Sequence, residues 1–160
     1  MEPILIVAPY PARIPNGKKN CKEYPWWNEL TSLIKEKTDY VIYQFVSLEE
    51  KKLSHIDYYI DTFNKLWEQE KLIKSCTCWI SVDNYFHHFM NVIDSGKKGI
   101  VLWGKTDPLI YGYPGNVNML KDRANLRKQK FSVLGIEDFD PKVFYRPTEV
   151  LEVLEELINI

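Results

Sequence analysis

Short continuous apolar runs alternate with amphipathic stretches along most of this chain. Such runs, bounded by turn residues, predict strands that are buried on both faces of a parallel sheet. The runs are Pro3–Ala8, Tyr40–Phe45, Ile56–Ile60, Trp79–Val82 and Gly99–Trp103.

Between these runs, apolar residues recur at helical spacing and predict helices. Pro25 suits the first position of a helix that continues to about Lys37, and a second helix ends before Cys76. A third helix is expected to stop at Ser95-Gly96, and Thr148 is expected to cap the last one. The apolar positions of the four helices are Trp26, Leu30, Leu33 and Ile34, then Leu66 and Ile73, then Phe86, Phe89, Met90 and Ile93, and finally Val150, Leu151, Leu154, Leu157 and Ile158.

This alternation predicts the α/β class, with a parallel sheet covered by helices on both faces. Residues 1–160 are expected to form a single Rossmann-like domain. The polar, proline-containing segment Pro9–Tyr24 follows the first strand, so it is expected to be a loop at the carboxyl edge of the sheet, where ligands commonly bind. Residues 116–145 fit neither pattern, and their structure stays open.

Composition narrows the function classes. The chain has 45% hydrophobic and 27% charged residues and no apolar run near the roughly 20 needed to cross a bilayer. We therefore expect a soluble, cytoplasmic protein with no transmembrane or targeting segment. A net charge of −1 argues against nucleic acid as a partner. Cys21, Cys76 and Cys78 lack paired Cys-x-x-Cys spacing, which indicates reduced thiols and predicts no structural zinc site.

Candidate chemistry gathers where a predicted strand passes directly into a helix. Asp83 stands at this junction and has two possible roles, capping the helix or binding a ligand hydroxyl. His88 lies in the first helical turn and is expected to be partly buried, whereas His87 faces differently and is expected to be more exposed. Neither histidine has an obvious triad partner or a metal-ligand repeat, so no metal and no resident cofactor is predicted.

Two other segments are candidates for contact with phosphate. Lys18, Lys19 and Lys22 surround the loop after the first strand, either as diphosphate ligands or as solvated surface lysines. Gly104-Lys105-Thr106 lacks the upstream glycine and the spacing of a Walker motif, which argues against nucleoside-triphosphate hydrolysis. Gly112 and Gly115 are expected to shape a ligand-facing loop. The tryptophans mostly occupy predicted core positions, namely Trp26, Trp27, Trp67, Trp79 and Trp103.

Three segments together resemble a known family. Ser81-Val82-Asp83, followed five residues later by His88, resembles a Ser-Val-Asp-Thr-Gly-Leu-Ser-His segment, and Leu102–Pro108 is similar to a loop with the sequence Gly-Pro-Thr-Asp-Pro. Lys22–Trp26 resembles a Lys-x-Trp-Pro opening. These segments occur in the carboxyl-terminal half of glycosyltransferase family 9, the lipopolysaccharide heptosyltransferases, which are two-domain GT-B enzymes. The resemblance covers nearly the whole chain.

The resemblance implies a nucleotide-sugar site. It places Lys22 near the phosphates, Asp83 near the donor sugar, and the turn 84–88 near the diphosphate, with Lys105 adding charge to the same rim. Glu49 or Glu50 aligns loosely with an acid that meets the nucleoside. The ligand-binding residues predicted in this way are Lys22, Asp83, Asn84, Tyr85, His88, Lys105, Thr106 and Asp107. Asn84 and Tyr85 depart from the family, which has threonine and glycine there.

The family places its catalytic base and acceptor site in the other half, so the resemblance implies a donor-binding domain that lacks the acceptor half. Sugar transfer would then need a partner protein or self-association, because a cleft needs both walls to place acceptor against donor. Two alternatives stay open: a non-catalytic module that binds or sequesters a nucleotide or nucleotide-sugar, and a structural α/β protein. The sugar, the base, the acceptor and the catalytic residues are not determined by the sequence.

Overall fold

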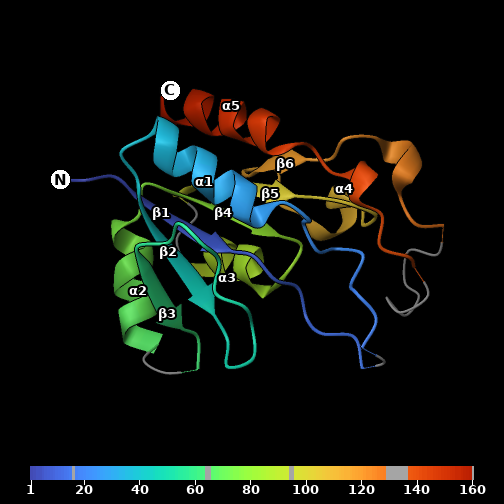
Figure 1. Cartoon of the computed structure of the whole chain (residues 1–160), viewed down its shortest axis with the longest axis horizontal. Helices are drawn as coiled ribbons and strands as arrows, with labels where there is room; N and C mark the ends of the chain where they lie inside the picture. The colour runs from blue at the N-terminus through green and yellow to red at the C-terminus, as the bar shows by residue number, and fades with distance from the viewer. Residues whose placement is uncertain (16, 64–65, 94–95, 129–136, 160) are drawn as a thin grey trace.

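The computed structural model describes residues 1–15, 17–63, 66–93, 96–128 and 137–159. A six-stranded sheet in the order β3-β2-β1-β4-β5-β6 runs through the centre of the molecule (Figure 1). Every neighbouring pair of strands is parallel. The strands are β1 (Ile4–Ala8), β2 (Val41–Val46), β3 (Tyr58–Asp61), β4 (Cys78–Val82), β5 (Lys98–Leu102) and β6 (Val117–Met119). The α/β class predicted from the sequence is confirmed.

Helices cover both faces of this sheet (Figure 1). They are α1 (Trp27–Lys37), α2 (Leu66–Ser75), α3 (Tyr85–Ile93), the short α4 (Pro108–Tyr111) and α5 (Pro147–Ile158), with 3₁₀ turns η1 (Arg123–Asn125) and η3 (Pro141–Val143). Alternate strand residues point to opposite faces. Leu5 and Val7 therefore pack in the core under α1 and α5, whereas Ile6 packs in the core under α2 and α3. No helix in the described ranges is long and apolar enough to span a membrane.

Two helix starts differ from the sequence prediction. Helix α1 begins at Trp27 rather than at Pro25, because Trp26 has non-helical backbone angles and its ring lies against the Arg146 guanidinium. Helix α5 begins at Pro147, whose fixed φ suits a first helical position, so Thr148 lies inside the helix and does not cap it.

The remaining differences are small. Each predicted strand lies within two residues of its observed bounds, and the predicted helix end at Ser95 lies outside the described residues. Strand β6 lies in the segment that the sequence left open, since three residues at a sheet edge carry little pattern. Trp67 is exposed at the start of α2 rather than in the core.

The strand order creates a specific place for a ligand. From the adjacent strands β1 and β4 the chain proceeds outward in opposite directions, so the loops that follow these two strands diverge. Open α/β sheets bind ligands in the crevice at this topological switch point. The Asn84 side-chain amide joins the two loops here, donating to the carbonyls of Ala8 at 2.9 Å and Tyr10 at 3.2 Å.

Candidate functional site

Asp83, the residue that follows β4, brings three segments of the chain together at the switch point. Its Oδ2 lies 2.7 Å from Lys22 Nζ, in the loop after β1, and accepts a hydrogen bond of 2.8 Å from Thr106 Oγ1, in the loop after β5. Its Oδ1 lies 3.2 Å from His87 Nε2 on α3. Asp83 is 5% exposed. The structure therefore places three side chains, from the loops after β1 and β5 and from α3, around one buried carboxylate.

The charged form of Asp83 is stabilised by these neighbours. Burial by itself would raise the pKa of Asp83, but the hydrogen bond from His87, the Lys22 charge and the Thr106 hydroxyl outweigh it and lower the pKa from its ordinary 3.8 to about 2. Asp83 thus stays ionised throughout the neutral range and holds the Lys22 ammonium at the carboxyl edge of the sheet.

This pKa predicts how Asp83 contributes to stability as the pH changes. A carboxyl whose pKa is lower in the folded state stabilises the fold above its unfolded pKa of 3.8, and this contribution disappears as the pH falls through about 2. The full contribution is on the order of 2 kcal/mol. Urea unfolding of wild type and Asp83→Asn at pH 5 and at pH 2 is expected to show the difference in free energy of unfolding shrinking at the lower pH. A difference that stays constant would contradict the assigned pKa.

The question of which residue caps α3 is settled by geometry. Asn84, not Asp83, supplies the cap, because its Oδ1 accepts a hydrogen bond of 2.9 Å from the backbone N–H of Phe86. Asn84 is buried and its amide donates to the loop after β1, so its described contacts are with the backbone around the site. Tyr85 is 51% exposed at the first turn of α3, and its ring packs edge-on against Phe86.

The two histidines have the opposite exposure to that predicted. His87 is fully buried and His88 is exposed. The reason is that residue 87 follows Asp83 by four positions and points back to it, while its ring packs edge-on against Trp103. His88 reaches the other side, where its Nδ1 lies 2.8 Å from the Tyr113 hydroxyl. Burial and the neighbouring His87 lower the pKa of His88.

The predicted ligand residues in the loop after β5 have two different sets of contacts. Thr106 joins the Asp83 cluster, but the buried Asp107 serves the fold, because its side chain caps α4 through the N–H of Leu109 and pairs with Arg123 through both oxygens, at 3.1 and 2.8 Å. Lys105 lies on the rim next to Arg127, whose backbone N–H donates to the Lys105 carbonyl. Gly112 follows α4, and a Cβ there would lie 2.6 Å from the Pro108 carbonyl oxygen, so the close packing of this loop favours glycine.

Several cations meet next to this cluster. Burial raises the pKa of the Cys21 thiol, and the charges of Lys22, Arg127 and Lys105 partly offset that effect, so all three cations lie close to one thiol. Lys18 pairs with Asp138 at 2.8 Å. Lys22, Lys105 and Arg127 therefore lie around one thiol, with the acidic Glu137 also among its neighbours.

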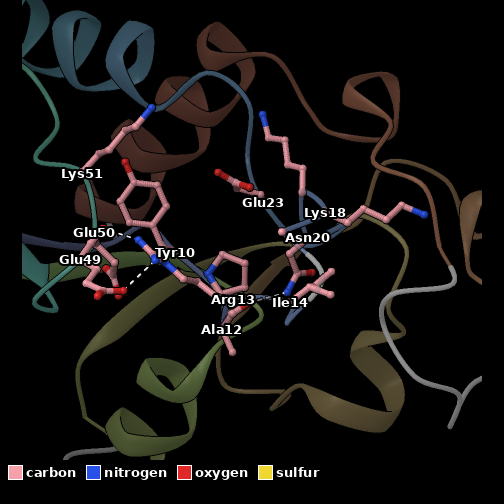
Figure 2. A pocket seen from close by; sticks show the side chains of 13 residues that line it. Tyr10, Ala12, Arg13, Ile14, Lys18, Asn20, Glu23, Glu49, Glu50 and Lys51 are labelled. Atoms are coloured by element: carbon pink, nitrogen blue, oxygen red, sulfur yellow. Dashed lines mark hydrogen bonds and ion pairs between the residues drawn. The ribbon is translucent and has the colours of Figure 1, made fainter.

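A pocket of about 530 Å³ opens beside the cluster (Figure 2). This volume is within the usual range of ligand pockets, about 300–1,000 Å³. Figure 2 shows Glu49, Glu50 and Lys51 reaching in from the connection after β2, opposite Lys18, Asn20 and Glu23 from the loop after β1. Tyr10 lies between these two groups, and burial, with Glu23 and Glu50 nearby, raises its pKa to about 12.

The pocket and the Asp83 cluster share parts of the same loop. Asn20 lines the pocket, and its Oδ1 accepts the backbone N–H of Lys22 at 3.0 Å. Tyr10 also lines the pocket, and its carbonyl accepts from Asn84. The pocket is therefore connected to Lys22 through Asn20 and to the start of α3 through Tyr10, although its described lining includes neither Lys22 nor a residue of α3. Sequence reasoning did not identify Tyr10, His87 or Tyr113 as residues of the site. For His87 a signal was available, because it follows Asp83 by four positions.

No protein-family model matches the chain, and a search of curated proteins finds no match either. Solved structures do match it. The E. coli ADP-heptose lipopolysaccharide heptosyltransferase II has a TM-score of 0.69 at 15% identity, covering 98% of this chain and 46% of its own. The fold is that of half a heptosyltransferase. An E. coli heptosyltransferase with ADP has a TM-score of 0.65 at 14% identity, and the match covers 98% of this chain and 44% of that structure's chain.

A glycosyltransferase family 9 structure from Veillonella parvula agrees, with a TM-score of 0.60 at 15% identity, covering 98% of this chain and 46% of its own. The chain thus spans about half the length of the structures that it matches. The resemblance predicted from the sequence is confirmed at the level of the fold, and the chain has a glycosyltransferase-like Rossmann architecture.

Proposed function

We propose that this chain is a nucleotide-sugar donor-binding domain of the glycosyltransferase type. The observation that carries the proposal is the meeting of Lys22, Asp83 and Thr106 at the switch point of the sheet, beside the pocket. One solved structure with this fold is named for ADP-heptose and another holds ADP, so a nucleoside diphosphate is a ligand that this fold accommodates elsewhere.

The charges favour a diphosphate at this position. The Lys22 ammonium carries three donors, and the pair with Asp83 occupies one direction. Lys105 and Arg127 add positive charge nearby, and the amino terminus of α3 contributes the partial positive charge of a helix end. Asp83 keeps the lysine in place and charged, so its first role is to position Lys22. A hydrogen bond from Asp83 to the donor sugar is a further prediction.

The nucleoside would occupy the pocket in Figure 2. Glu49 and Glu50 both line it, which agrees with an acid that meets ribose hydroxyls. Glu49 is held by Arg13 through a 2.7 Å ion pair, whereas Glu50 lies closer to Tyr10. We favour Glu50 as the acceptor of a ribose hydroxyl because Glu49 is paired with the Arg13 cation, whereas the described side-chain partner of Glu50 is the neutral Ser47 hydroxyl, which donates to Oε1 at 2.5 Å.

Calorimetric titration tests the proposal. Wild type in chelator-containing buffer is titrated with ADP, UDP, GDP and CMP and with their linked sugars. Binding of at least one nucleotide is expected, and Lys22→Met is expected to weaken it about tenfold or more, because a charge-assisted hydrogen bond is worth about 1.5–3 kcal/mol. Lys37→Met is the matched control: Lys37 ends α1, at the opposite edge of the sheet. No binding by wild type, or equal loss in both variants, would contradict the proposal.

Transfer itself requires a second wall to the cleft, which we propose is supplied by a separate protein or by a second copy of this chain. A preparation that binds a nucleotide-sugar is incubated with candidate acceptors, and product is sought by mass spectrometry alongside the oligomeric state from light scattering. Binding without product, in a monomer, would favour the alternative of a module that sequesters the nucleotide.

A further inference from the structure

We propose that Asp83, His87 and His88 form a binding site for a first-row divalent metal ion such as Zn²⁺. Each of the three side chains offers one ligand atom, and these atoms lie within 4.8 Å of one another. Two imidazoles and one carboxylate, with coordination positions left open, are a ligand set that proteins use for zinc and for non-haem iron. The metal site does not depend on the proposed function, but a role for the ion at a diphosphate rests on that function.

The geometry needs only a small adjustment. Bonds of about 2.1 Å in a tetrahedral site place ligand atoms about 3.4 Å apart, so the widest separation, at most 4.8 Å, must close by up to about 1.4 Å. His88 is the exposed member and can make this movement by rotating its side chain, whereas Asp83 and His87 are buried and already adjacent at 3.2 Å. We assign Nε2 of His88 as its ligand atom, because the Tyr113 hydroxyl lies 2.8 Å from Nδ1 and would orient the ring from outside the ligand set.

His87 is an unusual residue to find in a packed interior. Its side chain is fully buried, yet Nδ1 has no hydrogen-bond partner among the residues that the structure describes. Leaving a buried polar atom unpaired costs about 1–3 kcal/mol, so packing alone does not account for an imidazole at this position. In a metal site the ion would replace the proton that His87 Nε2 shares with Asp83 Oδ1, and the remaining ring proton would lie on Nδ1.

The neighbouring charges define when the ion binds well. Asp83 divides its oxygens: Oδ2 holds Lys22 and Thr106, while Oδ1 faces His87. The negative charge of Asp83 is balanced by Lys22, so a divalent ion on neutral imidazoles would leave the site with excess positive charge. A bound diphosphate would supply the missing negative charge. We therefore expect the ion and a nucleoside diphosphate to strengthen each other's binding by about tenfold, within the usual range of such coupling.

The first experiment uses the metal alone. Protein without a histidine tag is stripped of metal and titrated with Zn²⁺ by calorimetry and with Co²⁺ by visible absorption. One equivalent is expected to bind, with a ligand-field spectrum, and His88→Asn is expected to weaken binding at least tenfold. His55→Asn is the matched control, because His55 is the third histidine of the chain and asparagine tolerates its positive φ of 61°. Asp83→Asn tests the carboxylate in the same way.

The outcomes separate this inference from the proposed function. No saturable binding by wild type, or binding that His88→Asn leaves unchanged, would overturn the metal site even if nucleotides bind in chelator. Metal binding that depends on His88 and Asp83 supports the site even if no nucleotide binds. The coupling is measured next, as ADP affinity at saturating Zn²⁺ after correction for the Zn²⁺–ADP complex formed without protein; unchanged affinity would exclude the ion from the diphosphate site.

Discussion

Asp83→Ala is expected to lower the free energy of unfolding by about 3–5 kcal/mol, the usual result of removing one partner from a buried ion pair. The side chain of Lys22 is 19% exposed, so its ammonium would lose its counter-charge with little water to replace it. Thr106 and the buried His87 would lose their hydrogen-bond partner in the same step. Urea unfolding at neutral pH measures the change.

Two other aspartates serve as controls for this substitution. Asp107 is as buried as Asp83, but its partner Arg123 is 54% exposed and can be hydrated, so Asp107→Ala is expected to cost less, near the 1 kcal/mol typical of a helix cap. Asp138 is 85% exposed in its pair with Lys18, and Asp138→Ala is expected to change stability by less than about 1 kcal/mol.

A double substitution identifies the cause of the loss. If the unpaired ammonium is responsible, Asp83→Ala combined with Lys22→Met should cost less than the sum of the two single changes. Additive losses would show that Lys22 and Asp83 do not act as a pair. An Asp83→Ala protein as stable as Asp138→Ala would contradict the central position of Asp83 in the site.

Much of the fold was predictable because strands buried on both faces have an unambiguous pattern. Ile4–Ala8 and Cys78–Val82 are almost entirely apolar, and both occur close to where the sequence predicts them. Helix starts were less predictable, since they depend on tertiary contacts such as that of Trp26 with Arg146. A three-residue edge strand such as β6 carries too few positions to show any periodicity.

Part of the candidate site was predictable for a topological reason. In a parallel sheet the residues after neighbouring strands meet at one edge, so Asp83 and Thr106 were expected on the same rim, and they hydrogen-bond at 2.8 Å. The assignment of a cap was not predictable, because Asp83 and Asn84 are adjacent and both side chains can accept a backbone N–H. The structure resolves this through Asn84, whose amide also holds two carbonyls of the loop after β1.

The burial of His87 was missed because the sequence shows two adjacent histidines with no sign of which one faces the sheet. The answer depends on the direction in which α3 leaves β4, and that direction follows from the Asn84 cap and from Phe86 packing edge-on against Trp79. The pocket was also beyond sequence reasoning, since its walls come from two irregular loops. A site of this kind is therefore better predicted at strand ends than in loop interiors.

Gly99→Ala is expected to lower the free energy of unfolding by about 3 kcal/mol, at the upper end of the usual cost of overpacking. Gly99 on β5 is the register partner of Trp79 on β4, and a Cβ added there would lie 2.0 Å from the indole ring. Trp79 is 1% exposed and packs edge-on against Phe86 of α3, so it has no free space into which to move. Thermal or urea unfolding measures the change.

Gly115→Ala is the control, because a Cβ there has no atom within 4 Å and should be tolerated. Shrinking the obstructing ring should rescue the defect: Gly99→Ala with Trp79→Leu is expected to be more stable than the sum of the single changes predicts. The same contact positions the candidate site, since β4 leads to Asp83 and β5 leads to Thr106. A Gly99→Ala protein that loses no stability would show that the close approach of Trp79 is not a constraint. A Gly99→Ala protein that loses stability but keeps nucleotide affinity would show that the site tolerates displacement of the β4–β5 pair.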